Sequence, residues 1–120
     1  MDTTPWIGIG LEGTLSIQSP RCRDKVGPPV KPMLAKVLEL RRAGRRVKIF
    51  TARVSSTLSE EQRVINRQQI REWCLKHIGE ELEITAEKDP YLEEFYDDRA
   101  LQVEFNIGTI LTPETTKSWP

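Results

Sequence analysis

The order of apolar and polar residues along the chain predicts strands that alternate with helices. Short apolar runs bounded by glycine, proline and charged residues are typical of buried strands. The strands expected from these runs are residues 6–11, 47–51, 82–85 and 94–98, and the alternation over 101–105 predicts a further edge strand.

Helical spacing is found in the two segments that separate the first three runs. One helix is expected over 32–43, where it ends before Gly44. The other is expected over 59–77 and opens with a capping box formed by Ser59 and Gln62. The stripes expected to face the core are Leu34, Val37 and Leu38, with Arg41 at the edge, in the first helix, and Val64, Ile65, Ile70, Trp73, Cys74 and His77 in the second.

Strands and helices in this order predict a parallel sheet with right-handed crossovers. We therefore expect the α/β class, as a single three-layer Rossmann-like domain with a central, mainly parallel sheet. The domain is expected to cover residues 1–108, and an irregular Thr- and Pro-rich tail follows over 109–120. Residues 16–29 contain Ser, Pro and Gly and are expected to form a loop.

The composition suits one globular domain. Of the 120 residues 38% are hydrophobic and 30% are charged, which excludes the disordered and collagen-like classes. No apolar run approaches the roughly 20 residues of a membrane-spanning helix. Residues 1–5 lack the basic residue of a signal peptide, so we expect a cytoplasmic protein with no membrane partner. Cys22 and Cys74 show no metal-ligand spacing and are expected to be reduced thiols.

Charge is distributed unevenly although the net charge is zero. Residues 1–76 hold 15 Lys and Arg against 7 Asp and Glu, and residues 77–120 hold 3 against 11. Such clusters are usually solvated faces, but a phosphate-bearing ligand on the basic part or a metal near the acidic part also fits. Nucleic acid is not indicated, because no basic stripe is interleaved with aromatic residues. Association with a second copy or another protein stays an open alternative.

Four polar segments follow or end the predicted strands, and they are residues 10–14, 51–53, 88–90 and 97–99. Ligands of open α/β sheets bind beyond the carboxyl ends of the strands, so these segments are expected to meet. Together they hold a hydroxyl, an ammonium, paired carboxylates and free amides, which are the groups of a phosphate and magnesium site. Taken singly, each residue also has a structural interpretation: a strand glycine for Gly10, a helix cap for Thr51, a surface turn for Lys88, and solvated or Arg-paired acids for Asp97 and Asp98.

With these segments in this order, residues 6–106 resemble the haloacid dehalogenase-like (HAD-like) phosphatase superfamily, and look closest to its small phage and bacterial members. The family motif Asp-x-Asp-Gly-Thr-Leu corresponds here to Gly-Leu-Glu-Gly-Thr-Leu at 10–15. The other three motifs are matched by Thr51, by Lys88 two residues before a proline, and by the pair at 97–98. Only about 14 residues separate the first motif from Val30, so the resemblance implies a domain without a cap.

The first motif departs from the family pattern at both of its catalytic positions. In the family the first Asp attacks phosphorus and also ligates magnesium, and this position is Gly10 here. The second Asp is the general acid and base, and its counterpart Glu12 is a degenerate acid/base one methylene longer. Since glycine has no nucleophile, the covalent route does not exist in this chain.

The resemblance also implies roles for the residues that remain. Phosphate would be bound by the Thr51 hydroxyl, by Lys88 and by the amides of Leu11, Glu12 and Ala52, and a weakened magnesium site would use the Glu12 carbonyl, Asp97 and Asp98. We expect a degenerate HAD-like protein that binds phosphate or a phosphorylated ligand, or contacts a protein partner, without turnover. The alternative is a magnesium-dependent phosphomonoesterase in which Glu12 activates a water molecule.

Overall fold

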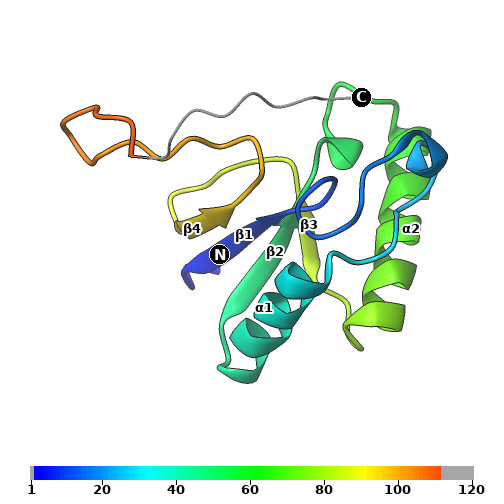
Figure 1. Cartoon of the computed structure of the whole chain (residues 1–120). Coiled ribbons are helices and arrows are strands. Elements are labelled where there is room, and N and C mark those ends of the chain that lie inside the picture. The colour runs from blue at the N-terminus through cyan, green and yellow to red at the C-terminus, as the bar shows by residue number, and fades with distance from the viewer. Residues whose placement is uncertain (1, 112–120) are drawn as a thin grey trace.

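A single parallel sheet forms the centre of the fold. The computed structural model describes residues 2–111, and its strands lie in the order β3-β2-β1-β4 (Figure 1). Their bounds are β1 (Trp6–Gly10), β2 (Arg46–Phe50), β3 (Glu83–Thr85) and β4 (Leu92–Tyr96). All three strand pairings are parallel, so the predicted α/β class and Rossmann-like sheet are confirmed.

Two helices connect the first three strands. They are α1 (Lys31–Arg42) and α2 (Glu60–His77), and the short turns η1 (Pro20–Cys22) and η2 (Ala52–Val54) lie in the loops before them. The Ser59 hydroxyl caps α2 by accepting a hydrogen bond from the Gln62 amide at 3.1 Å. The Gln62 side chain donates to Asn66 instead of reaching back, so only half of the predicted capping box forms.

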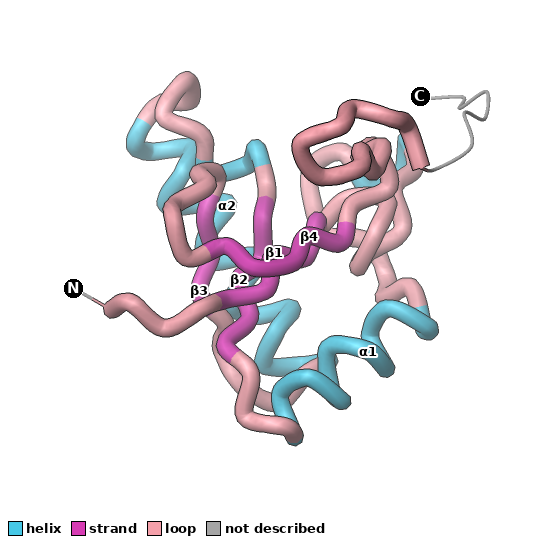
Figure 2. Tube along the Cα trace, turned by 90° about the vertical axis from the view of Figure 1, so that its left-hand side faces the viewer, coloured by secondary structure: helices cyan, strands magenta, loops and turns pink. Residues whose placement is uncertain are grey.

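Both helices cover the same face of the sheet. The buried core joins alternate residues of β1 and β2, which point to one face, to residues of α1 and α2. The core residues of these four elements are Ile7, Ile9, Val37, Leu40, Val47, Ile49, Ile70, Trp73 and Cys74. Two successive right-handed crossovers in the same direction put their helices on one side of a sheet. Figure 2 shows α1 on one side of the strands and the loop that follows β4 on the other.

The opposite face of the sheet is covered by a connection without a helix. Since β3 and β4 are the two edges, residues 86–91 must cross the sheet between them. The crossing is held where Trp6 Nε1 donates to Asp89 Oδ1 at 2.7 Å and Lys48 Nζ lies 3.4 Å from Asp89 Oδ2. The Lys48 ammonium also lies 4.4 Å from the centroid of the Trp6 ring. We expected a three-layer α/β domain. Within residues 2–111 the helices form one outer layer, the sheet forms the central layer, and this crossing loop forms the other outer layer.

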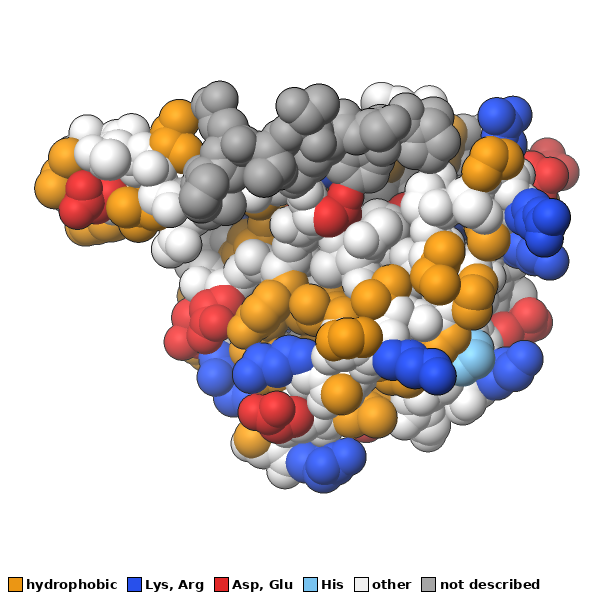
Figure 3. All heavy atoms as spheres, viewed as in Figure 1, with side chains coloured by type: hydrophobic (Ala, Val, Ile, Leu, Met, Phe, Trp, Pro, Cys, Tyr) orange, Lys and Arg blue, Asp and Glu red, His pale blue; other side chains and the backbone are white. Residues whose placement is uncertain are grey.

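The segment predicted as an edge strand lies outside the sheet. Residues 101–111 form a projecting hairpin closed by an antiparallel bridge between Val103 and Ile110 (Figures 1 and 3). Its turn contains Asn106 and Gly108 at positive φ. The alternation that predicted a strand is real, but the hairpin leaves these apolar side chains exposed: Leu101, Val103, Phe105, Ile107, Ile110 and Leu111. Of the predicted tail 109–120, residues 112–120 lie outside the described residues.

The predicted face of α2 was wrong in its first turns. Val64 and Ile65 are 60% and 45% exposed, because the helix meets the core through Ile70, Trp73 and Cys74. Strand β4 also ends two residues before the expected position, which leaves the acidic pair at 97–98 in the following loop. Within residues 2–111 no helix is long and apolar enough to cross a membrane.

Candidate functional site

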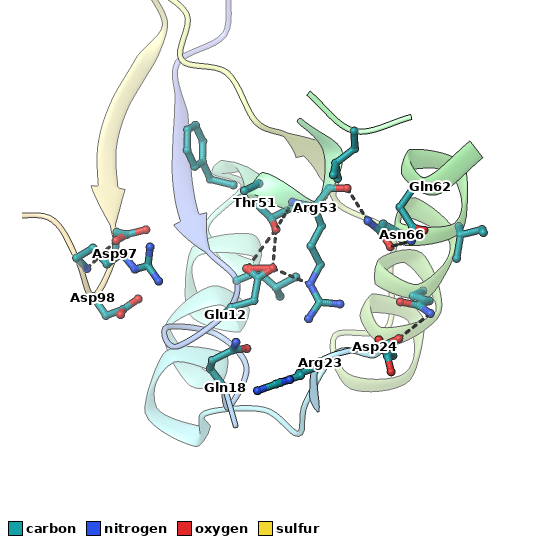
Figure 4. A pocket seen from close by; sticks show the side chains of 17 residues that line it. Glu12, Gln18, Arg23, Asp24, Thr51, Arg53, Gln62, Asn66, Asp97 and Asp98 are labelled. Atoms are coloured by element: carbon teal, nitrogen blue, oxygen red, sulfur yellow. Dashed lines mark hydrogen bonds and ion pairs between the residues drawn. The ribbon is translucent and has the colours of Figure 1, made fainter. Parts of the chain in front are cut away.

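An open cleft of about 840 Å³ lies at the carboxyl ends of β1, β2 and β4 (Figure 4). Its walls include Glu12 after β1, Thr51 after β2 and Asp97 after β4. The loop before α1 contributes Arg23, and α2 contributes Asn66 among others. This is the position at which open α/β sheets bind ligands, and it brings together three of the four segments expected to meet.

Two donors converge on one carboxylate in the centre of this cleft. The Thr51 hydroxyl donates to Glu12 Oε1 at 2.7 Å, and Arg53 Nε donates to the same oxygen at 2.8 Å. The Thr51 side chain is buried, whereas the side chains of Arg53 and Glu12 are 16% and 25% exposed. An anion is therefore already bound here, and that anion is the side chain of Glu12.

The turn after β2 fixes both donors. The Thr51 amide donates to the Thr85 carbonyl of β3 at 2.9 Å, which continues the sheet by one residue. The Thr51 hydroxyl oxygen accepts a hydrogen bond from the Arg53 amide at 3.2 Å and so caps η2. From the far side Asn66 Nδ2 donates to the Arg53 carbonyl at 2.8 Å, so α2 holds the same turn. The anion-binding geometry is thus built from β2, β3 and α2 together.

Position 10 offers no side chain, and its space is taken by Asp97. A Cβ built at Gly10 would lie 2.7 Å from Asp97 Oδ2, which is closer than real Cβ atoms approach. The other oxygen of Asp97 accepts from the Arg99 amide at 2.7 Å. The carboxylate of Asp97 therefore stands beside the position where the resemblance places a nucleophile.

A second contact joins the loop after β1 to the acidic pair. Thr14 Oγ1 donates to Asp98 Oδ1 at 2.7 Å and accepts from the Asp98 amide at 3.0 Å. Gly13 has φ +85°, and a Cβ there would be 3.1 Å from both oxygens of Asp98. Both the positive φ and the close carboxylate require glycine at this turn. Asp98 is thus paired with Thr14 rather than with an arginine, the pairing that the sequence left open.

The backbone amides predicted to bind phosphate differ in availability. The Leu11 amide donates to the Phe50 carbonyl at 3.3 Å, so it is used by the sheet. Among residues 2–111 the amides of Glu12 and Ala52 donate to no acceptor, and both residues line the cleft. Two of the three predicted amides are thus available to a ligand.

The predicted magnesium ligands are engaged in protein contacts. Asp97 accepts from a backbone amide and Asp98 from the Thr14 hydroxyl. In the described part of the chain, no group of three or more His, Cys, Asp or Glu side chains is arranged to hold a metal ion. A site made from the Glu12 carbonyl, Asp97 and Asp98 stays a prediction.

Lys88 is not brought to the cleft. It is exposed on the loop that crosses the sheet and is absent from the cleft lining. Its neighbour Asp89 is bound to Trp6, the first residue of β1, whereas the cleft lining begins at Leu11, roughly 17 Å further along the chain. The cation that does meet Glu12 is Arg53, which the sequence did not single out as a phosphate-binding residue. Its place two residues after a strand-ending threonine is the signal that identifies it.

No protein-family model, curated protein or solved structure matches this chain. A function for this chain must therefore be inferred from the geometry of the cleft. The cleft combines fixed donors that hold a carboxylate with a strand end that has no nucleophile at position 10.

Proposed function

We propose that this chain is a HAD-like phosphate-binding protein that holds phosphate or a phosphorylated ligand in the cleft without hydrolysing it. One observation carries the proposal: Thr51 and Arg53 converge on a single carboxylate oxygen of Glu12, at 2.7 and 2.8 Å. A phosphoryl oxygen is also anionic and accepts the same hydrogen bonds. The motif order of the chain supports the family, and the family supports phosphate as the anion.

Ligand binding would exchange one anion for another. A phosphoryl oxygen would replace the Glu12 carboxylate on Thr51 and Arg53, and the amides of Glu12 and Ala52 would donate to further oxygens. Charge-assisted hydrogen bonds of this kind each contribute about 1.5–3 kcal/mol before desolvation is counted. Since Glu12 is partly exposed at the cleft, its side chain has space to swing toward solvent.

Turnover is not part of the proposal, because position 10 cannot form a covalent intermediate. Gly10 has no nucleophile, and the Asp97 carboxylate fills the space beside it. The donors are all protein groups, so binding should depend little on magnesium.

Calorimetric titration with inorganic phosphate, with and without magnesium, tests this proposal. We expect binding under both conditions, and a loss of affinity of at least about tenfold, or 1.4 kcal/mol, in Thr51→Val and Arg53→Gln. Thr51→Ser keeps the hydroxyl and should keep the affinity. Lys88→Ala removes an exposed cation outside the cleft and serves as the matched control. Thermal unfolding of each variant checks that it is folded.

Two results would contradict the proposal. Absence of binding at millimolar phosphate by a folded wild-type protein would mean that the donors serve Glu12 alone. Steady magnesium-dependent hydrolysis of a generic phosphomonoester, abolished by Asp97→Asn, would favour the phosphomonoesterase instead.

A further inference from the structure

A second groove, of about 520 Å³, lies beside the cleft along the carboxyl-terminal half of α2. Its other wall is the loop over residues 21–28. Gln69 lines both the groove and the cleft, so the two hollows adjoin each other. From Gln62 in the cleft to His77 in the groove, the helix rises roughly 22 Å.

The groove is rich in cations that have no acidic partner. Arg21 and Lys25 come from the loop, and Lys76 comes from the last turn of α2. Within residues 2–111 none of these side chains forms an ion pair, and Glu72 is the one acidic residue that lines the groove. Such a surface attracts anions along its whole length.

The loop that carries these cations is fixed in place. Trp73 Nε1 donates to the Gly27 carbonyl at 2.7 Å, and Gln69 Nε2 donates to the Asp24 carbonyl at 3.1 Å. Arg53 of the cleft donates to the Cys22 and Lys25 carbonyls at 3.3 and 3.1 Å. The arginine that meets Glu12 therefore also positions the wall of the groove.

We propose that the cleft and the groove together bind a single-stranded oligonucleotide that carries a terminal phosphate. The terminal phosphate occupies the cleft, as in the proposed function on which this inference rests, and the following phosphodiesters run along the groove. Several phosphates in series match several unpaired cations in series, as in other single-strand grooves. Because Trp73 is 6% exposed, its ring offers no platform for base stacking, so binding is indifferent to base sequence.

Fluorescence anisotropy with internally labelled oligothymidylate tests the inference. The phosphorylated oligonucleotide is expected to bind at least tenfold more tightly than the same chain without its terminal phosphate. Lys25→Ala/Lys76→Ala should weaken its binding at least tenfold and leave the calorimetric affinity for inorganic phosphate unchanged. The logarithm of the association constant falls linearly with the logarithm of the salt concentration. This dependence should be about 1.4 less steep in the variant, because two cations are lost. Lys31→Ala/Arg42→Ala removes two exposed cations of α1 as the matched control.

The outcomes separate this inference from the proposed function. If phosphate binds through Thr51 but the oligonucleotide binds no more tightly and ignores Lys25 and Lys76, the inference is wrong and the phosphate site stands. If oligonucleotide binding depends on Lys25 and Lys76 but not on the terminal phosphate, the joint site is wrong, and the phosphate site is judged by the calorimetric titration alone. A doubly phosphorylated peptide that binds as tightly as the oligonucleotide would overturn the assignment to nucleic acid.

Discussion

The Asp97 carboxylate lies against Gly10, so close that a Cβ at position 10 would be 2.7 Å from Asp97 Oδ2. The two residues are separated by most of the chain and meet because β4 pairs directly with β1. Glycine at position 10 therefore does more than remove a nucleophile: it makes room for the Asp97 carboxylate. Returning an aspartate to position 10 would first require Asp97 to move.

We expect Gly10→Ala to destabilise the protein through this contact. The added methyl group overpacks the site, which typically costs about 1–3 kcal/mol of unfolding free energy. In an Asp97→Ala background the same change should cost less, with a coupling energy of about 0.5–3 kcal/mol in urea unfolding. Gly8→Ala is the matched control, because its Cβ would meet Phe95, Trp6 and Leu92 instead. Equal costs in both backgrounds would show that the contact has no energetic consequence.

Replacing Glu12 by glutamine is expected to raise the affinity for phosphate. Glutamine is a neutral acceptor and competes less well for Thr51 and Arg53, so Kd should fall by about tenfold, or 1.4 kcal/mol. The same change should lower stability by about 1 kcal/mol, because the partly exposed ion pair with Arg53 is lost.

Glu81→Gln provides the control for this effect. It removes one exposed carboxylate outside the cleft and should leave the phosphate Kd unchanged. A phosphate Kd that is the same or weaker in Glu12→Gln would mean that the carboxylate assists the ligand and does not compete with it.

Local patterns were enough to predict most elements of the fold. The apolar runs and helical stripes place both helices and β1, β2 and β3 within one residue of their observed bounds. The parallel direction of the strands then followed from the order of the elements, whereas the sequence did not predict which strands pair. The face of α2 was harder to predict, because Val64 and Ile65 have helical spacing but no element within residues 2–111 buries them.

Only those site residues that lie just after a strand could be predicted from the sequence. Glu12, Thr51 and Asp97 share the cleft because they follow parallel strands. Lys88 lies elsewhere because its loop crosses the sheet, and that path depends on the long-range pair of Trp6 and Asp89. The cationic groove was equally hidden, since its residues come from segments about 50 positions apart. Neither arrangement leaves a local signal in the sequence.

The crossing loop supplies a third prediction. The pKa of Asp89 is held below its usual value mainly by the hydrogen bond from Trp6, with the Tyr91 amide and Lys48 adding to it. Asp89→Ala should therefore release residues 86–91, seen as faster hydrogen exchange in that segment. Phosphate affinity should not change, because the loop does not line the cleft. Glu81→Gln is the control carboxylate, because Glu81 is exposed and does not line the cleft, and a loss of phosphate binding in Asp89→Ala would place this loop at the site.

The last prediction concerns alkaline pH and the thiol of Cys74. Burial in the core raises its pKa from 9.0 to about 11, so the folded state keeps a proton that the unfolded state releases. The associated stability is fully present below pH 9 and is lost as the pH rises from 9 to about 11, because the unfolded state then binds fewer protons. The loss approaches about 3 kcal/mol over this interval, at 1.36 kcal/mol per pH unit. Lysines and tyrosines also titrate in this range, so urea unfolding of the wild type is compared with Cys74→Ala at pH 8 and 10. The variant should be less stable at pH 8 and should lose less stability on going to pH 10. Parallel losses in the two proteins would show that Cys74 ionises freely in the folded state.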